Sequence, residues 1–184
     1  MNRGAWSKRF FMAGSGAFLL AGIMTFSMLG AETLTYREVE GEAAATHVIT
    51  IIPEGGGFRV ELATTRAGGV VRQTFRTAAD LATLEWTFSD PARKMELTAV
   101  VQGEAIVLSG TFQGKKVAKK FPARGTPWNQ LFQMGLGPFT LAGGESMTFR
   151  SIGTQGPGEL KIGKMSVTRK EDEVIELGGK KIDA

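Results

Sequence analysis

The sequence offers few side chains that could carry out catalysis. Its 184 residues include one histidine and no cysteine, which excludes thiolate zinc sites, iron–sulfur clusters, disulfides and a cysteine nucleophile. The single histidine, His47, stands at the start of an expected strand, where it could act as a base or as a metal ligand. A lone histidine in a strand is more often structural. We therefore expect no metal and no cofactor.

Two short motifs approach active-site patterns without completing them. Residues 144–148 come close to a nucleophile elbow, but Thr148 stands where the last glycine belongs. Residues 135–137 begin like a dinucleotide fingerprint, but Thr140 occupies the position of its third glycine. Neither motif predicts an enzyme.

Carboxylates are numerous but do not form a recognisable site. Glu85 and Glu96, on neighbouring expected strands, could do acid–base chemistry if both faced a wet cleft. Both alternate with apolar residues, so we expect them on the solvent face. The acidic run at 171–173 lacks the spaced oxygen ligands of a calcium loop. We expect a non-enzymatic protein, with a hydrolase acting on envelope material as the least favoured alternative.

Residues 1–31 read as a secretory signal peptide. Arg3, Lys8 and Arg9 precede an apolar run over residues 10–29, and this segment contains no acid. That order is typical of export signals, so we expect cleavage near Ala31 and a periplasmic protein. About 20 apolar residues are also enough to span a bilayer. An uncleaved anchor in the inner membrane is the alternative.

Removal of this segment changes the charge of the chain. The whole sequence has a formal net charge of +4, but residues 32–184 hold 19 of the 22 Lys and Arg and all 18 Asp and Glu, which leaves +1. A nearly neutral domain lacks the positive field that neutralises nucleic-acid phosphates. We therefore exclude nucleic acid as a partner.

After residue 31, the hydrophobic pattern has a period of two. Phe58, Val60 and Leu62 alternate with Arg59 and Glu61, as in a strand with one buried face. Alternation of this kind predicts strands over residues 33–40, 46–52, 58–62, 70–77, 84–89, 95–101, 104–112, 115–121, 146–152, 160–169 and 173–177. Short turns rich in glycine separate them, so successive strands must pair antiparallel.

The sequence thus predicts a mainly β protein with one domain over residues 32–184. An antiparallel meander of about ten strands must curl into a half-barrel or barrel, because a long sheet twists and has to cover its apolar face. One short inserted helix is expected over residues 127–134, with Thr126 as its cap and Pro127 at its first position. Residues 180–184 read as the start of a returning strand, which leaves open a truncated C-terminus.

Aromatic residues in the middle of the chain define a candidate ligand site. A curled sheet with one short helix leaves part of its concave side unfilled, and such spaces hold hydrophobic ligands. The candidate ligand-binding residues are Trp86, Phe88, Trp128, Leu131 and Phe132. Ordinary core packing would also explain these residues.

A basic group precedes the expected helix. It comprises Lys115, Lys116, Lys119 and Lys120. Lysines protect an exposed edge strand from aggregation, and near aromatic residues they also favour docking on an anionic membrane surface. Both interpretations remain open.

A signal peptide followed by a long antiparallel meander with a late helix resembles the bacterial periplasmic half-barrels of the lipoprotein-carrier type and related domains of unknown function. The resemblance is one of architecture and covers most of residues 32–184. It implies that an acyl chain or another apolar ligand binds on the concave face. The alternative is an interaction or scaffold module with a solid core, whose edge strands bind another envelope protein.

Overall fold

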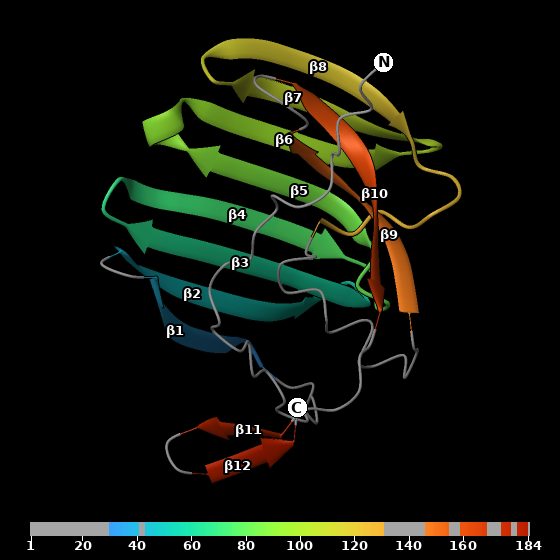
Figure 1. Ribbon diagram of the computed structural model, residues 1–184. Helices are drawn as coiled ribbons and strands as arrows, with labels where there is room; N and C mark the ends of the chain where they lie inside the picture. The colour runs from blue at the N-terminus through green and yellow to red at the C-terminus, as the bar shows by residue number, and fades with distance from the viewer. Residues whose placement is uncertain are drawn as a thin grey trace, which may run out of the picture.

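Eight strands form one antiparallel sheet in which every strand pairs with its neighbours in sequence. The computed structural model describes residues 30–40, 43–130, 146–154, 159–168, 174–177 and 180–183. The strands of the sheet are β1 (Glu32–Glu40), β2 (Ala43–Glu54), β3 (Gly57–Arg66), β4 (Gly69–Thr77), β5 (Thr83–Asp90), β6 (Met95–Gln102), β7 (Ala105–Phe112) and β8 (Lys115–Pro122). The sheet is open, with β1 and β8 as its edges (Figure 1). This confirms the predicted antiparallel meander in half-barrel form.

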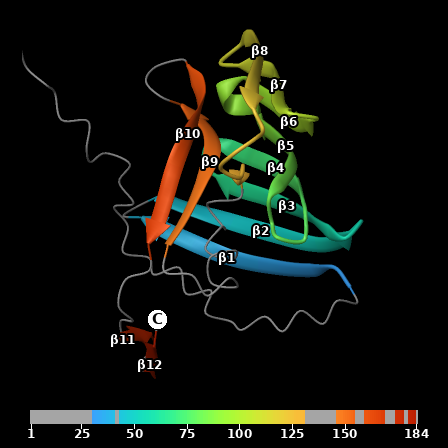
Figure 2. The ribbon, with the colours of Figure 1, turned by 90° about the vertical axis from the view of Figure 1, so that its right-hand side faces the viewer.

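The next strands leave the meander. β9 (Ser146–Thr154) and β10 (Leu160–Thr168) pair with each other in a two-stranded sheet. β11 (Val174–Leu177) and β12 (Lys180–Asp183) form another, so the expected returning strand is present. Figures 1 and 2 show that β9 and β10 run across the strand direction of the large sheet. The meander itself therefore has eight strands, and the following hairpin packs against it as a second layer.

Strand register gathers the apolar residues on one side of the sheet, here called the inner face. Val60 pairs with Ile51 of β2 and with Phe75 of β4. The buried residues of this face are Ile49, Val60, Leu62, Phe75, Trp86, Leu97, Ala99, Ile106, Leu108 and Phe112. Trp128, Ile152 and Leu160 complete the same core from the second layer. Apolar burial, at about 25 cal/mol per Å², therefore holds the two layers together.

A β-bulge in β5 interrupts the alternation of side chains in the strand predicted over residues 84–89. Arg76 pairs with Glu85, but Thr77 pairs with Thr83, so Leu84 is the extra residue. Leu84 is 40% exposed, whereas Thr83 is 2% exposed. A bulge reorients the side chains next to it, and here it turns the Thr83 hydroxyl inward, where it accepts a hydrogen bond from the backbone of Gln130.

The helix expected over residues 127–134 is absent from the part of that segment that the structure describes. Trp128 forms a parallel β-bridge with Arg150. The Asn129 amide donates to the Arg150 carbonyl (2.9 Å), and the Arg150 amide donates to the Pro127 carbonyl (2.8 Å). The Pro127 carbonyl is thus occupied by Arg150, whereas in a helix that starts here it would accept a bond from the next turn of the helix. Residues 131–134 lie outside the described residues, whose named helical element is the 3-10 turn η1 (Pro91–Arg93).

Gly110 lies where β7 approaches β6 too closely to leave room for a side chain. Its φ is +135°, and a Cβ atom at this position would collide with the backbone of Glu96 on β6. We expect Gly110→Ala to lower the free energy of unfolding by about 3 kcal/mol, because strain and collision add. Gly103→Ala is the matched control, since Gly103 also has a positive φ (+59°) but open space around it. It should cost only about 1 kcal/mol. Urea unfolding measures both, and equal losses would contradict the predicted collision.

Candidate functional site

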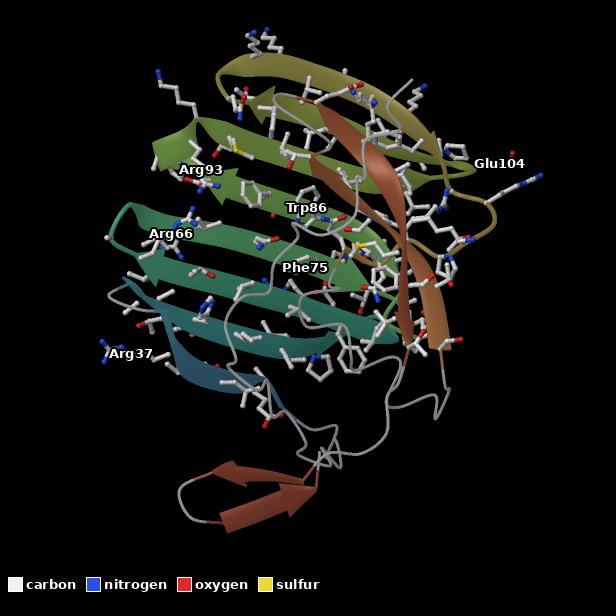
Figure 3. The ribbon with its side chains drawn as sticks, viewed as in Figure 1. Arg37, Arg66, Phe75, Trp86, Arg93 and Glu104 are labelled. Carbon is white, nitrogen blue, oxygen red and sulfur yellow. The ribbon has the colours of Figure 1, made fainter. Side chains whose placement is uncertain are left out.

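The inner face places two of the expected ligand-binding residues side by side on β5. Trp86 is 4% exposed, and its indole nitrogen donates to Gln73 Oε1 at 3.1 Å. Phe88 is half-buried against the core, with its ring centroid 5.8 Å from that of Trp86. Figure 3 shows Trp86 and Phe75 on adjacent strands near the middle of the sheet. Trp86 is therefore a core residue, while Phe88 keeps part of its ring accessible.

Trp128 reaches the same core from residues 127–130, here called the strap. Its side chain is buried at 4% exposure. Its carbonyl accepts a hydrogen bond from the Thr83 amide (2.9 Å), so the strap lies between the start of β5 and β9. Leu131 and Phe132, the other two expected ligand-binding residues, lie outside the described residues. The structure thus brings together Trp86, Phe88 and Trp128.

Gln130 is the centre of a buried polar cluster that connects the strap to β9. Its Nε2 atom donates to the Ile152 carbonyl (2.9 Å), and its Oε1 atom accepts from the Ile152 amide (2.8 Å). The same oxygen accepts from the Trp128 indole and from the Ser151 hydroxyl. Gln130 is 7% exposed. The side chain thus acts as a backbone-like partner of Ile152 and fixes the position of the hairpin.

Next to Gln130, Asn129 brings a second amide into the interior. Asn129 is 1% exposed, and its Oδ1 atom is buried without a hydrogen-bond partner among the described residues. Its backbone amide is satisfied by the Arg150 carbonyl. The strap therefore carries two buried amide side chains: in Gln130 both the oxygen and the nitrogen have hydrogen-bond partners, and in Asn129 the oxygen is an unused acceptor.

Arg150 of β9 holds the chain that leaves β8. Its guanidinium donates to three backbone carbonyls, those of Pro122 (2.6 Å), Ala123 (3.0 Å) and Thr126 (2.7 Å). The Ala123 and Thr126 carbonyls lie outside regular secondary structure and their bonds are partly buried, so these two groups need such a partner. Arg150 therefore fixes the position of the segment between β8 and the strap through its hydrogen bonds.

The four expected docking lysines lie on two faces of β8. The register places Lys115 beside Phe112 and Lys119 beside Leu108, so these two share the inner side. Lys116 and Lys120 pair with Thr111 and Val107 and face the outer side. Strand alternation thus divides the basic group.

Lys119 connects the edge of the sheet to β10. Its Nζ atom donates to the Leu160 carbonyl (2.8 Å) and lies 3.6 Å from Glu159 Oε1. Lys161 Nζ lies 3.0 Å from Glu159 Oε2. The hydrogen bond from Lys161, with the charges of Lys161 and Lys119, lowers the pKa of Glu159 below its ordinary value. The pairing therefore persists at neutral pH and is lost as the pH falls through that lowered pKa.

The residues considered for catalysis or metal binding, His47, Glu85 and Glu96, lie within the strands of the large sheet. His47 Nδ1 lies 3.1 Å from Thr64 Oγ1, across the pair of β2 and β3. Glu85 pairs in register with Val100 and Glu96 with Ser89, so the two carboxylates stand at different positions along their strands. The sites at residues 135–140 and 171–173 lie outside the described residues. Among the described residues, no group of three or more acidic or histidine side chains could hold a metal ion.

Comparisons with known proteins give no match. No family model, no curated protein and no solved structure matches this chain. In the part of the chain that the structure describes, no helix is long and apolar enough to cross a membrane.

Sequence reasoning missed the residues that hold the second layer in place. Gln130 and Arg150 appear in the sequence as ordinary polar residues of a turn and a strand. Glu159 appears as one of many surface carboxylates. Gln130 bonds Ile152 and Arg150 bonds Thr126, which lie 22 and 24 residues away along the chain, and Glu159 pairs with Lys119 of β8. No local pattern records such contacts. One signal was available: Gln130 follows two residues after Trp128, inside an apolar segment where a long polar side chain needs a partner.

Arg150 should contribute more to stability than an arginine in an exposed ion pair. We expect Arg150→Met to lower the free energy of unfolding by about 2–4 kcal/mol, because three carbonyls lose their donor. Arg76→Met is the control, since Arg76 is paired only with Glu85 among the described residues, in a largely exposed bridge. Its cost should be at most about 1 kcal/mol. Urea unfolding measures both variants, and similar losses would show that the Arg150 contacts contribute little.

Proposed function

We propose that this protein is a non-enzymatic binding protein of the cell envelope that holds a hydrophobic ligand against the inner face of its sheet. Residues 1–31 direct its export, and the folded domain acts in the periplasm. An uncleaved N-terminal anchor would instead keep it at the inner membrane. The ligand is a lipid or another molecule with an extended apolar part.

The observation that carries this proposal is the form of the apolar interior. An open eight-stranded sheet presents one continuous apolar face, and the described element that crosses it is a two-stranded hairpin (Figures 1 and 2). Several apolar side chains of this interior remain partly exposed, namely Leu34, Ile51, Phe58, Phe88, Met95, Val101, Val117, Phe121 and Ile162. Burying such surface under a ligand is favourable by about 25 cal/mol per Å².

The open edges of the sheet support a second candidate function. β1 and β8 each have a strand partner on one side, and an unpaired edge can add a strand from another protein. In this alternative, the domain is an interaction module with a solid interior. The lysines of β8 count against strand addition at that edge, because lysine is a common protection against it.

Mass spectrometry of the protein recovered from the cell envelope tests the proposal directly. We expect the denatured mass to correspond to a chain that begins near Glu32. We expect the native spectrum to show an additional lipid-sized mass that denaturation removes. A cleaved protein without any adduct would support the interaction module. A full-length mass found only in membranes would make the protein an anchored domain.

Phe88 offers a variant that tests ligand binding without removing a fully buried side chain. We expect Phe88→Ala to weaken binding of a fluorescent fatty-acyl probe about tenfold, because less apolar surface remains to cover the acyl chain. Leu84→Ala is the matched control: it lies on the same strand but is 40% exposed at the bulge, and its affinity should not change. Circular dichroism verifies the fold of both variants. Equal probe affinity in wild type and Phe88→Ala would contradict a ligand site on this part of the inner face.

A further inference from the structure

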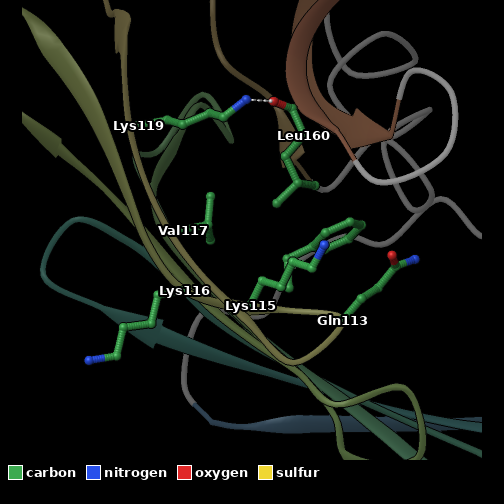
Figure 4. A pocket seen from close by; sticks show the side chains of 7 residues that line it. Gln113, Lys115, Lys116, Val117, Lys119 and Leu160 are labelled. Carbon is green, nitrogen blue, oxygen red and sulfur yellow. Dashed lines mark hydrogen bonds between the residues drawn. The ribbon is translucent and has the colours of Figure 1, made fainter.

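A small hollow lies where the edge strand β8 meets the start of β10. It has a volume of about 210 Å³ and is lined by Phe112, Gln113, Lys115, Lys116, Val117, Lys119 and Leu160 (Figure 4). Phe112 and Leu160 are 6% and 5% exposed, and Val117 is half-buried against the same core. The floor of the hollow is therefore apolar and continuous with the inner face.

The rim of this hollow is positively charged. Lys115 and Lys119 lie on the inner side of β8 with Val117 between them, whereas the Lys116 side chain points away from the hollow in Figure 4. Lys119 has Glu159 as an acidic partner. Lys115 has no ion-pair partner among the described residues. An unpaired ammonium group at the mouth of an apolar hollow favours a ligand with one anionic end.

The carboxylate of Glu159 is an anion that already pairs with lysines at this rim. Its carboxylate lies between two ammonium groups, 3.6 Å from Lys119 Nζ and 3.0 Å from Lys161 Nζ. The side chains of Glu159 and Lys161 are about half exposed, at 52% and 48%, so this pairing is accessible to a competing anion. A carboxylate of the chain itself thus already occupies part of the charged rim.

We infer that the ligand is a long-chain carboxylate, with its head at Lys115 and its chain on Phe112, Val117 and Leu160. The apolar chain continues from the hollow onto the inner face. This inference rests on the proposed function for the acyl chain and adds the chemical class of the ligand. It also predicts that the negative charge of Glu159, which pairs with the other lysine of the rim, weakens binding of the ligand's carboxylate. Lys119 also donates a hydrogen bond to the Leu160 carbonyl, so its substitution would disturb the contact between β8 and β10. Substitution of Lys115 is therefore the test of the charge alone.

Competition binding with the full chain separates the head from the tail of the ligand. Palmitate and 1-hexadecanol share the same chain and differ in charge, and each displaces a fluorescent fatty-acid probe. We expect palmitate to bind about fivefold more weakly to Lys115→Gln and more tightly to Glu159→Gln, because one variant removes an attractive charge and the other a repelling one. Hexadecanol affinity should be the same in both variants and in wild type.

Arg37→Gln is the matched control for net charge. Arg37 is exposed on β1, the opposite edge of the sheet (Figure 3), and palmitate affinity should not change there. A loss equal to that of Lys115→Gln would show a general effect of net charge and overturn the assignment.

The remaining outcomes distinguish this inference from the proposed function. If palmitate and hexadecanol bind equally well to every variant, the charged rim is overturned and the hydrophobic site stands. If neither binds, the proposed function fails and the inference fails with it. Another outcome is that neither lipid binds from solution but the protein binds vesicles of anionic phospholipid in a Lys115-dependent manner. In that case the lysines bind a membrane surface and the assignment is overturned.

Discussion

The pairing of the Gln130 side chain with the backbone of Ile152 fixes how the two layers of this domain meet. Apolar contact between the sheet and the hairpin supplies attraction but little direction, because burial is roughly proportional to area and not to angle. An amide inside that contact is different, since each unsatisfied donor or acceptor would cost about 1–3 kcal/mol. Gln130 bonds both backbone groups of Ile152 while the strap bonds those of Arg150, so a shifted hairpin would leave buried groups without partners. The polar contact therefore selects one position for the hairpin among many apolar ones.

The path of the chain after β8 follows from the same constraint. A ninth strand of the meander would have paired with β8, but the strap instead bonds Thr83 of β5 and Arg150 of β9. This route needs partners for the carbonyls between β8 and the strap, and the Arg150 guanidinium supplies three of them. It also needs the bulge at Leu84, which turns the Thr83 hydroxyl toward Gln130. The edge of the sheet remains open because the chain turns inward before it can extend it.

Local sequence pattern predicts the strands and the inner face, because the period of two is a property of each segment alone. Val60 and Trp86 were placed on apolar faces by alternation, and register aligns both with Phe75 of β4. The helix at 127–134 was predicted because Pro127 and the spacing after Trp128 suit a helix, yet the β-type partners of this segment lie far away in sequence. The same limit applies to the basic group: alternation separates Lys115 and Lys119 from their neighbours, but nothing near them in sequence indicates Glu159. The residues of the candidate site that depend on long-range contacts could not be predicted.

The two attachments of the hairpin differ in strength, and the difference bears on where a ligand can reach the interior. At the strap, Gln130 and Ser151 are buried, and their hydrogen bonds are protected from water. At β8, the attachment is a hydrogen bond from Lys119 and an ion pair with the exposed Glu159, and exposed ion pairs contribute about 1 kcal/mol or less. The layers therefore separate more easily at the end where Leu160 meets β8 than at the strap. That end is also where the apolar interior reaches the surface beside Lys115, which has no ion-pair partner among the described residues, so the weaker of these two attachments lies beside the charged hollow.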